Sequence, residues 1–268
     1  MAREFLPNVY WIQECGKNLG DLAAAMLKGS HNWYQEGREI HIPQNAFLFA
    51  GQKTLLFDTL SPASSEEIIT ELHDVLKERS LDYLVISHTD TPHAGNTFKI
   101  LQAFPEARLV APRYGDAHEL YHLEDALKVG EGDSIDLGGF IVHFHEATFL
   151  DAPISLWMTE ENTRMLLPVD WLGIPHMDKE CLTCVDELDA EVNEDRLHQF
   201  HGRVFFWLHY VDVPKTIAEI DRINRLFDPE VIAPAHGLVI RKNAMKYMEM
   251  MKGVVQLISE QERIGVVG

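Results

Sequence analysis

The 268-residue sequence has only three cysteines and no long apolar run. Three cysteines are too few for a disulfide framework, so a reducing cytoplasm is the expected location. No stretch of about 18 apolar residues occurs, and the N-terminal residues lack the apolar segment that a signal peptide needs. We therefore expect a cytoplasmic protein without a leader and without membrane contact.

Basic side chains are also scarce. The 23 Lys and Arg residues are outnumbered by 42 Asp and Glu residues, which gives a net charge of −19 at pH 7. Because such a charge repels phosphates, we expect neither nucleic acid nor an anionic membrane as a non-specific partner. Histidine, in contrast, is abundant, with 14 residues. Metal binding is therefore the first hypothesis.

No repeat, low-complexity segment or Pro/Gly/Ser-rich linker divides the sequence, so we expect a single domain over residues 1–268. A β-hairpin is predicted over residues 45–59, and a capping box of Ser64 and Glu67 is predicted to open a helix that ends near Leu76. Further strands are predicted over 81–87, 108–111, 139–144, 154–158, 165–169 and 231–234. Further helices are predicted over 96–103, 116–123, much of 178–199, from Pro214 onward and at the C-terminus. This order predicts an α/β fold, an αββα sandwich.

Four short segments place His or Asp directly after a predicted apolar strand. They are His88-Thr-Asp90-Thr-Pro92-His93, Asp151-Ala-Pro, Asp170-Trp-Leu-Gly and Pro-Ala-His236-Gly. Strand ends at one edge of a sandwich can converge on a point, and carboxylates mixed with imidazoles suit divalent transition metals. The four segments together therefore predict a metal centre.

These segments carry a family resemblance. The first is similar to the metallo-β-lactamase signature H-x-H-x-D-H-x-G, and more so to its flavodiiron form, H-x-E-x-D-H-x-G. Residues 45–59 resemble the family's opening hairpin, and the other three segments resemble flavodiiron H-W-P-D-S, D-x-F-G and A-P-S-H-G. The resemblance covers residues 8–245 and implies the metallo-β-lactamase fold. The flavodoxin domain that normally follows is absent from the sequence.

The resemblance also implies a site for two metal ions. It assigns as ligands His88, Asp90 and Asp151 on the first metal, and His93 and His236 on the second, with Asp170 bridging. The resemblance further implies that Asp58 supports the site without binding metal.

The sequence departs from the family at two of these positions. Pro92 replaces an aspartate, which would leave the second metal an open or water-filled position, and Asp151 replaces a histidine, which makes the first metal richer in oxygen ligands. Such a set favours iron or manganese over zinc. We expect two iron ions, with zinc or manganese as the alternative. His145, six residues before Asp151, is the alternative ligand, although it alternates with His143 along a predicted strand.

Three functions remain open. The first is a di-iron protein that binds or reduces O2, NO or peroxide, with electrons from a separate partner, or that acts as an oxygen sensor. The second is a two-metal hydrolase of a phosphodiester, thioester or lactone, against which the loss of aspartate at Pro92 counts. The third is a binding module whose metal is structural. The family resemblance also implies a homodimer.

The remaining cysteines and histidines are expected to be structural. Cys181 and Cys184 form a C-x-x-C pair, but no second pair completes a four-cysteine site, and the acidic surroundings raise the thiol pKa. Four other histidines are pocket candidates at best and are expected to be satisfied surface or core residues: His31, His41, His176 and His209.

Overall fold

The computed structural model describes residues 2–15, 37–113, 125–151 and 154–262, and its chain divides into two compact units. The first unit contains residues 1–14 and 44–162, and the second contains residues 15–43 and 163–268. The single domain expected from the sequence stays a prediction. Within the described residues, no helix has the length and apolar character needed to cross a membrane.

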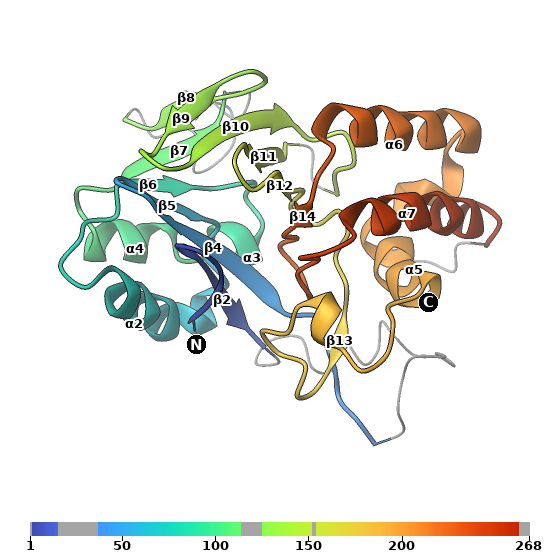
Figure 1. Ribbon diagram of the computed structural model, residues 1–268, viewed down its shortest axis with the longest axis horizontal. Helices are drawn as coiled ribbons and strands as arrows, with labels where there is room; N and C mark the ends of the chain where they lie inside the picture. Colours follow the sequence, from blue (N-terminus) through green and yellow to red (C-terminus); the bar gives the residue numbers. More distant parts are fainter. Residues whose placement is uncertain (1, 16–36, 114–124, 152–153, 263–268) are drawn as a thin grey trace. The chain divides into compact units, whose positions relative to one another are not determined.

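A seven-stranded sheet is the frame of the first unit (Figure 1). Its strands, in spatial order, are β1 (Ala2–Leu6), β2 (Val9–Glu14), β4 (Gln44–Ala50), β5 (Thr54–Phe57), β6 (Tyr83–Val85), β7 (Arg108–Pro112) and β8 (Leu127–Val129). The strands from β1 to β5 pair antiparallel, and those from β5 to β8 pair parallel. The antiparallel pairing of β4 with β5 confirms the predicted hairpin.

Two helices, α2 (Ser65–Leu76) and α4 (Thr97–Ala103), cover one face of this sheet (Figure 1). Leu72 of α2 and Ile100 of α4 belong to the same buried apolar cluster as Leu48 of β4. The predicted capping box is wrong, because the Ser64 side chain makes no capping hydrogen bond. A short 3-10 helix over Pro62–Ser64 runs directly into α2, so Ser64 lacks the extended backbone that a capping serine needs.

The opposite face of β4 carries Phe47 and Phe49, because successive side chains of a strand point to opposite faces. Phe49 packs edge-on against Phe140, with ring centroids 5.6 Å apart. Phe140 lies between the first two of three antiparallel strands that form a second layer: β9 (Ser134–Asp136), β10 (Ile141–Glu146) and β11 (Leu156–Glu160). These strands confirm two predictions, those over 139–144 and 154–158.

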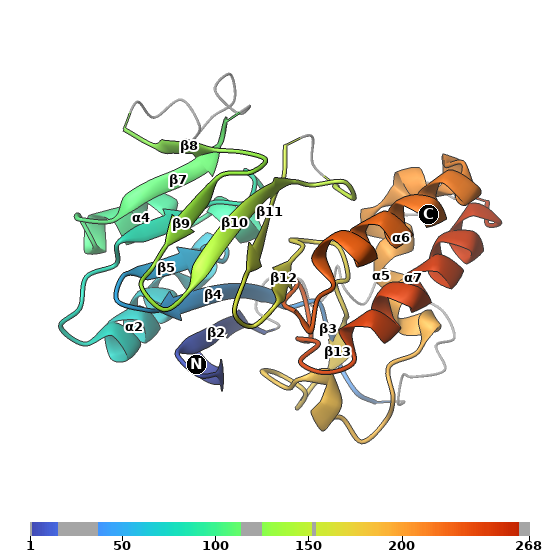
Figure 2. The same ribbon diagram turned by 45° about the horizontal axis from the view of Figure 1, so that its top comes forward.

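The second unit is rich in helices. Its elements are β3 (Ile40–His41), β12 (Met165–Leu167), β13 (His176–Met177), α5 (Glu194–Val204), α6 (Val213–Phe227), β14 (Val231–Ile232) and α7 (Ala244–Ser259). Helix α7 packs against both α5 and α6 (Figure 2). Strand β12 runs parallel to β14, and β3 pairs antiparallel with β13. The predicted helices at Pro214 and at the C-terminus are confirmed by α6 and α7.

The helices predicted over much of 178–199 are wrong for most of that range. Turns and one short 3-10 helix (Val185–Glu187) occupy it until α5 begins at Glu194. Lys179 and Leu182 have positive φ angles of 70° and 54°, which a right-handed helix excludes. The Asn193 side chain accepts a hydrogen bond from a backbone N–H of α5 and so fixes where that helix starts. The helix predicted over 116–123 lies outside the described residues.

The cysteines also differ from expectation. Cys15 and Cys181 form a disulfide, with Cα atoms 6.4 Å apart, although 166 positions separate them in the sequence. Cys184 lies outside this disulfide and is buried. The sequence predicted no disulfide, because the partner of Cys181 comes from a distant segment and not from the C-x-x-C.

His201 of α5 is a buried histidine that links two segments of the second unit. Its Nδ1–H donates to the carbonyl oxygen of Leu197 at 2.8 Å, and its Nε2 accepts from the backbone N–H of Leu172 at 2.9 Å. Burial lowers the pKa of His201 to about 4. The ring is therefore neutral near pH 7.

The low pKa of His201 predicts acid sensitivity. An unfolded histidine titrates near pH 6.5, so below that pH the unfolded state binds more protons and the protein loses stability until about pH 4. From pH 7 to pH 5 this group alone should lower the free energy of unfolding by about 2 kcal/mol. In His201→Phe that part of the loss should vanish, as measured by urea unfolding of chelator-treated protein. An unchanged pH dependence in the variant would contradict this account.

Candidate metal centre

In the first unit, two of the predicted ligands, His88 and His93, are held together by one turn after β6. Residues 86 and 87 lead from the strand to His88, and the short helix α3 (Thr91–Ala94) then presents His93. The two rings lie 3.9 Å apart between centroids, and the residues are only 1% and 2% exposed. The strand-end position predicted for His88 is thus confirmed.

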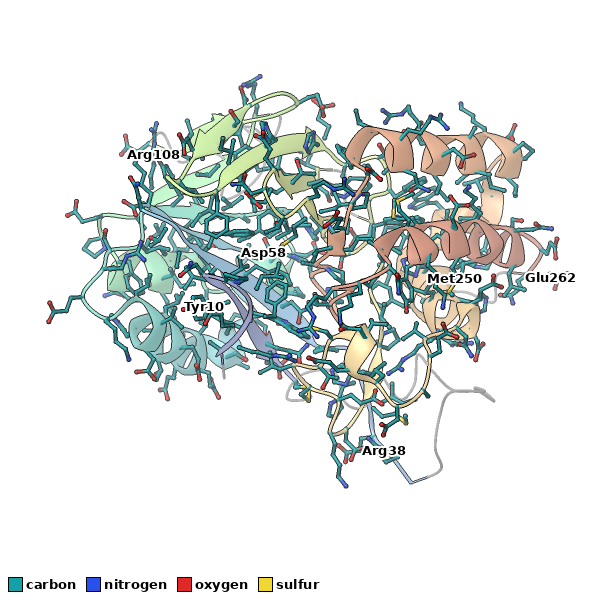
Figure 3. All side chains as sticks on the ribbon, viewed as in Figure 1. Tyr10, Arg38, Asp58, Arg108, Met250 and Glu262 are labelled. Atoms are coloured by element: carbon teal, nitrogen blue, oxygen red, sulfur yellow. A yellow bond between two sulfur atoms is a disulfide. The ribbon has the colours of Figure 1, made fainter. Side chains whose placement is uncertain are left out.

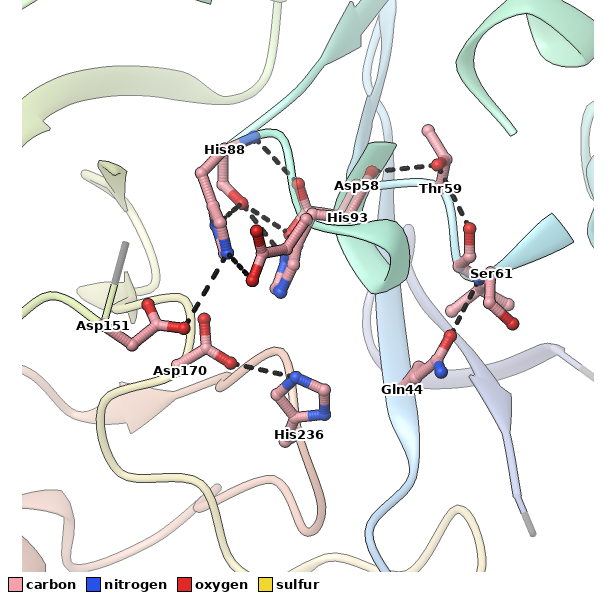
Figure 4. Close-up of polar contacts among 12 residues, drawn as sticks. Gln44, Asp58, Thr59, Ser61, His88, His93, Asp151, Asp170 and His236 are labelled. Carbon is pink, nitrogen blue, oxygen red and sulfur yellow. Dashed lines mark hydrogen bonds and ion pairs between the residues drawn. The ribbon is translucent and has the colours of Figure 1, made fainter. Parts of the chain in front are cut away.

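The buried carboxylate of Asp58 orients this turn (Figures 3 and 4). It accepts hydrogen bonds from His93 Nδ1–H at 2.7 Å and from the backbone N–H and the hydroxyl of Ser87, both at 2.9 Å. Because the proton of His93 is on Nδ1, its Nε2 carries the lone pair that can bind a metal. Asp58 therefore orients the His93 imidazole, which is the supporting position that the family resemblance implies for it.

Two carboxylates lie within reach of His88. Its Nε2 is 3.8 Å from Asp90 Oδ2 and 4.0 Å from Asp151 Oδ2 (Figure 4). The ligand atoms of these three residues all lie within 4.8 Å of one another. Ligand atoms about 2.0–2.2 Å from one ion can be up to about 4.4 Å apart, so these spacings are close to those of a metal site. Asp90 is 60% exposed and Asp151 is 17% exposed.

The second unit holds the other two predicted ligands, Asp170 and His236. They follow the parallel neighbours β12 and β14, whose carboxyl ends meet at one edge. Asp170 Oδ1 lies 2.9 Å from His236 Nε2 (Figure 4). His236 Nδ1–H donates to the carbonyl oxygen of Pro43 at 2.9 Å. As in His93, Nε2 is the ring nitrogen that faces the predicted site.

The residue after His236 must be glycine. Gly237 has a φ of +89°, and a Cβ atom on it would lie 1.8 Å from the carbonyl oxygen of Ile174. The same segment is tied to Ile174, whose N–H donates to the carbonyl oxygen of His236 at 3.1 Å. Close approach of these two backbones therefore fixes the direction of the His236 side chain.

His145, the alternative ligand, has other contacts. On β10 its Nε2 lies 2.8 Å from the hydroxyl of Thr159, and its Nδ1 lies 3.3 Å from Glu131. Burial lowers its pKa. Among the described residues, the groups of three or more clustered metal-binding side chains do not include it. Pro92, at the position where the family has aspartate, is the second residue of α3 and is half-buried.

Sequence reasoning missed a second group of metal-binding side chains in the second unit. Their ligand atoms all lie within 4.8 Å of one another, and they are Cys15, His41, His176 and Cys181. The prediction that His41 and His176 are ordinary histidines is therefore incomplete. His209 contacts backbone carbonyl oxygens at Gly202 and Gln261, and His31 lies outside the described residues.

Comparison with known proteins identifies the family and the fold. Residues 41–179 match the family model of the metallo-beta-lactamase superfamily. The chain is 29% identical over 212 residues to the nitric oxide reductase of Moorella thermoacetica, covering 76% of this chain and 51% of that protein. It is 28% identical over 265 residues to the coenzyme F420H(2) oxidase of Methanothermobacter marburgensis, covering 94% and 61%. The chain thus spans about half to three fifths of the length of these curated relatives.

Two solved structures show the fold. The rubredoxin oxygen:oxidoreductase of Desulfovibrio gigas superposes with a TM-score of 0.73 at 22% identity, covering 97% of this chain and 61% of that one. The flavodiiron protein of Giardia intestinalis gives a TM-score of 0.71 at 17% identity, covering 97% and 59%. These likenesses confirm the predicted metallo-β-lactamase fold.

The contact between Asp58 and His93 predicts the effect of Asp58→Asn. An amide keeps the shape of the carboxylate but loses its charge, so it holds the Nδ1 proton of His93 more weakly. Metal affinity should fall about 10–100-fold while the circular dichroism spectrum is kept. Metal content after dialysis against buffered free metal measures this effect.

Asp82→Asn is the matched control for Asp58→Asn. Asp82 also accepts hydrogen bonds within the first unit, from the backbone N–H and the hydroxyl of Thr54. Its substitution should leave metal content unchanged. Equal losses of metal in the two variants would show that Asp58 acts through stability alone.

Proposed function

The chain belongs to the metallo-beta-lactamase superfamily, and from this premise we propose that it is a non-haem di-iron protein that binds or reduces O2, NO or peroxide. The observation that carries the proposal is the carboxylate of Asp90, 3.8 Å from His88 Nε2. In the hydrolase form of the family signature that position holds a histidine. A carboxylate there makes the ligand set harder, which favours iron.

The proposed centre consists of three imidazoles and three carboxylates: His88, Asp90, His93, Asp151, Asp170 and His236. When bound, iron would supply redox chemistry and a position for a small ligand such as O2 or NO. The protein's part is orientation and the exclusion of water. Asp58 fixes the Nδ1 proton of His93, and the Pro43 carbonyl oxygen fixes that of His236. Burial of both imidazoles keeps bulk water from competing for Nε2.

The proposed reaction partners come from the names of the relatives. They are named as a nitric oxide reductase, an F420H(2) oxidase and, in Megalodesulfovibrio gigas, a rubredoxin-oxygen oxidoreductase. For this chain we infer a separate electron donor, or a role as an oxygen sensor. A cytoplasmic homodimer, implied by the family resemblance, is part of the same proposal.

Hydrolysis, the alternative from the sequence, is not favoured. The relatives are oxidoreductases by name. The family resemblance also implies that Pro92 stands where hydrolases of the family hold the attacking water with an aspartate. A zinc or manganese hydrolase is therefore not proposed.

The first test is metal content. Protein made in iron-replete cells should contain about two iron ions per chain, and Asp151→Ala should retain about one because it removes a donor of the first metal only. His145→Ala is the control and should retain two. Elemental analysis together with the optical spectrum, with and without O2, measures both. If His145→Ala empties the site and Asp151→Ala does not, His145 is the ligand and the ligand assignment is wrong.

The second test concerns position 92. Pro92→Asp should supply the missing carboxylate, keep two metals and weaken azide or NO binding at least about 10-fold, because a filled shell has no labile position. Thr91→Asp adds the same charge one residue earlier, on an exposed residue of α3. It should bind azide as the parent protein does. Unchanged azide affinity in Pro92→Asp, measured by optical titration, would contradict an open position on the second metal.

A further inference from the structure

A second cluster of ligand side chains lies in the second unit, built on the pairing of β3 with β13. In this antiparallel pair His41 lies directly opposite His176. The two rings approach edge-on, with centroids 5.5 Å apart. His176 is fully buried, and the side chain of His41 is 11% exposed. Two distant segments thus bring two imidazoles to one point.

Two sulfur atoms complete the cluster. Cys15 Sγ lies 3.3 Å from His41 Nδ1 and 3.5 Å from His176 Nε2, and Cys181 Sγ lies 3.7 Å from His41 Nδ1. Zinc binds sulfur at about 2.3 Å and nitrogen at about 2.0 Å, so a tetrahedral site holds sulfur and nitrogen about 3.6 Å apart. All three measured distances are close to that value. The sulfur atoms, now joined in a disulfide, would need to separate to about 3.8 Å.

One nitrogen of each imidazole faces the sulfurs. His176 Nδ1–H donates to the carbonyl oxygen of Met177 at 2.8 Å, which leaves Nε2 as the acceptor facing Cys15. A backbone carbonyl on the far nitrogen is typical of metal-binding histidines. His41 Nδ1 faces both sulfurs, and its Nε2 lies 3.6 Å from the exposed carboxylate of Glu39, beyond hydrogen-bonding distance.

The turn that carries Cys181 is held in place. The Glu180 carboxylate accepts from the Met177 N–H at 2.9 Å and from the guanidinium of Arg196 at 2.5 Å. The same guanidinium donates to the carbonyl oxygen of Pro175 at 2.6 Å. Arg38 (Figure 3), two residues before β3, pairs with Asp178, which follows β13. The segments that carry His41 and Cys181 are therefore held in place without a metal.

We propose that Cys15, His41, His176 and Cys181 form a Cys2His2 zinc site in the reduced protein, and that the disulfide is its oxidised, metal-free state. Two thiolates and two imidazoles are the ligands of a closed structural zinc site. The site contains none of the six residues proposed for iron, and its soft thiolates select a different metal. It stands whether or not the di-iron proposal holds.

The two states interconvert by a two-electron step. A peroxide takes two electrons from the zinc-bound thiolates: the S–S bond forms, the O–O bond breaks, and two protons are taken up. Zn²⁺ and two waters, or an alcohol and water, are released. A dithiol reverses the change by returning two electrons and two protons to the disulfide and itself becoming a disulfide. Zinc then rebinds as the two thiols lose their protons.

The test uses cobalt as a coloured probe for zinc in the full-length protein. After metal removal and reduction by a dithiol that is then washed out without oxygen, Co²⁺ should give thiolate-to-metal charge-transfer absorption at about one equivalent. The six-residue centre has no thiolate, so Co²⁺ bound there cannot give this band. Adding Zn²⁺ should bleach it, because zinc binds such sites more tightly than cobalt. The oxidised protein should show no band.

Variants identify the ligands. Cys15→Ser and Cys181→Ser should each lose the band, and His41→Asn should weaken cobalt binding at least about 10-fold. Cys184→Ser, which replaces the buried cysteine outside the disulfide, is the matched control and should keep it. The proposal is overturned if the reduced parent protein shows no band, or if Cys184→Ser loses the band while Cys15→Ser keeps it. The absence of the band in the reduced parent protein is an outcome that needs no variant. The test therefore remains decisive even if a variant misfolds.

Discussion

The hydrogen bond from His93 to the buried carboxylate of Asp58 is the interaction on which the ligand turn of the first unit depends. A fully buried carboxylate is costly unless its oxygens are satisfied, and Asp58 accepts from three donors on the segment that follows β6. Those donors tie the end of β5 to His88 and His93 at once. Loss of the carboxylate would therefore release both imidazoles together.

In the second unit, backbone carbonyl groups instead of a carboxylate orient the histidine rings. The Nδ1–H of His236 and of His176 each donates to a main-chain carbonyl oxygen, from Pro43 and Met177 respectively. A carbonyl cannot lose its acceptor character through titration, and it moves only with the fold. The direction of each ring is then set by strand register and by close backbone approach, as at Gly237. The fold therefore orients the rings of His236 and His176 without a metal.

The sequence predicted what short-range patterns encode. The hairpin at 45–59 and the strand before His88 are local, because apolar runs and turn residues specify them without distant partners. The helices predicted over much of 178–199 were wrong before Glu194, since positive φ angles at Lys179 and Leu182 accompany the turn around Glu180. The pairing of Cys15 with Cys181 is a tertiary contact, and no local spacing could reveal it.

The hardness of the ligands alone does not decide which of the two proposed metals, iron or zinc, binds at each site. Zinc binds most nitrogen and oxygen sites more tightly than ferrous iron, so the carboxylates near His88 alone do not exclude it. A thiolate site in the same chain changes the competition, because zinc gains most from sulfur ligands and would bind at Cys15 and Cys181 first. When zinc is scarce, the thiolate site would take it up and leave the harder site to iron. Oxidation to the disulfide removes the two thiolate ligands, so zinc would then compete with iron for the carboxylate site. Iron occupancy of the proposed di-iron centre should therefore depend on whether Cys15 and Cys181 are reduced or joined in the disulfide.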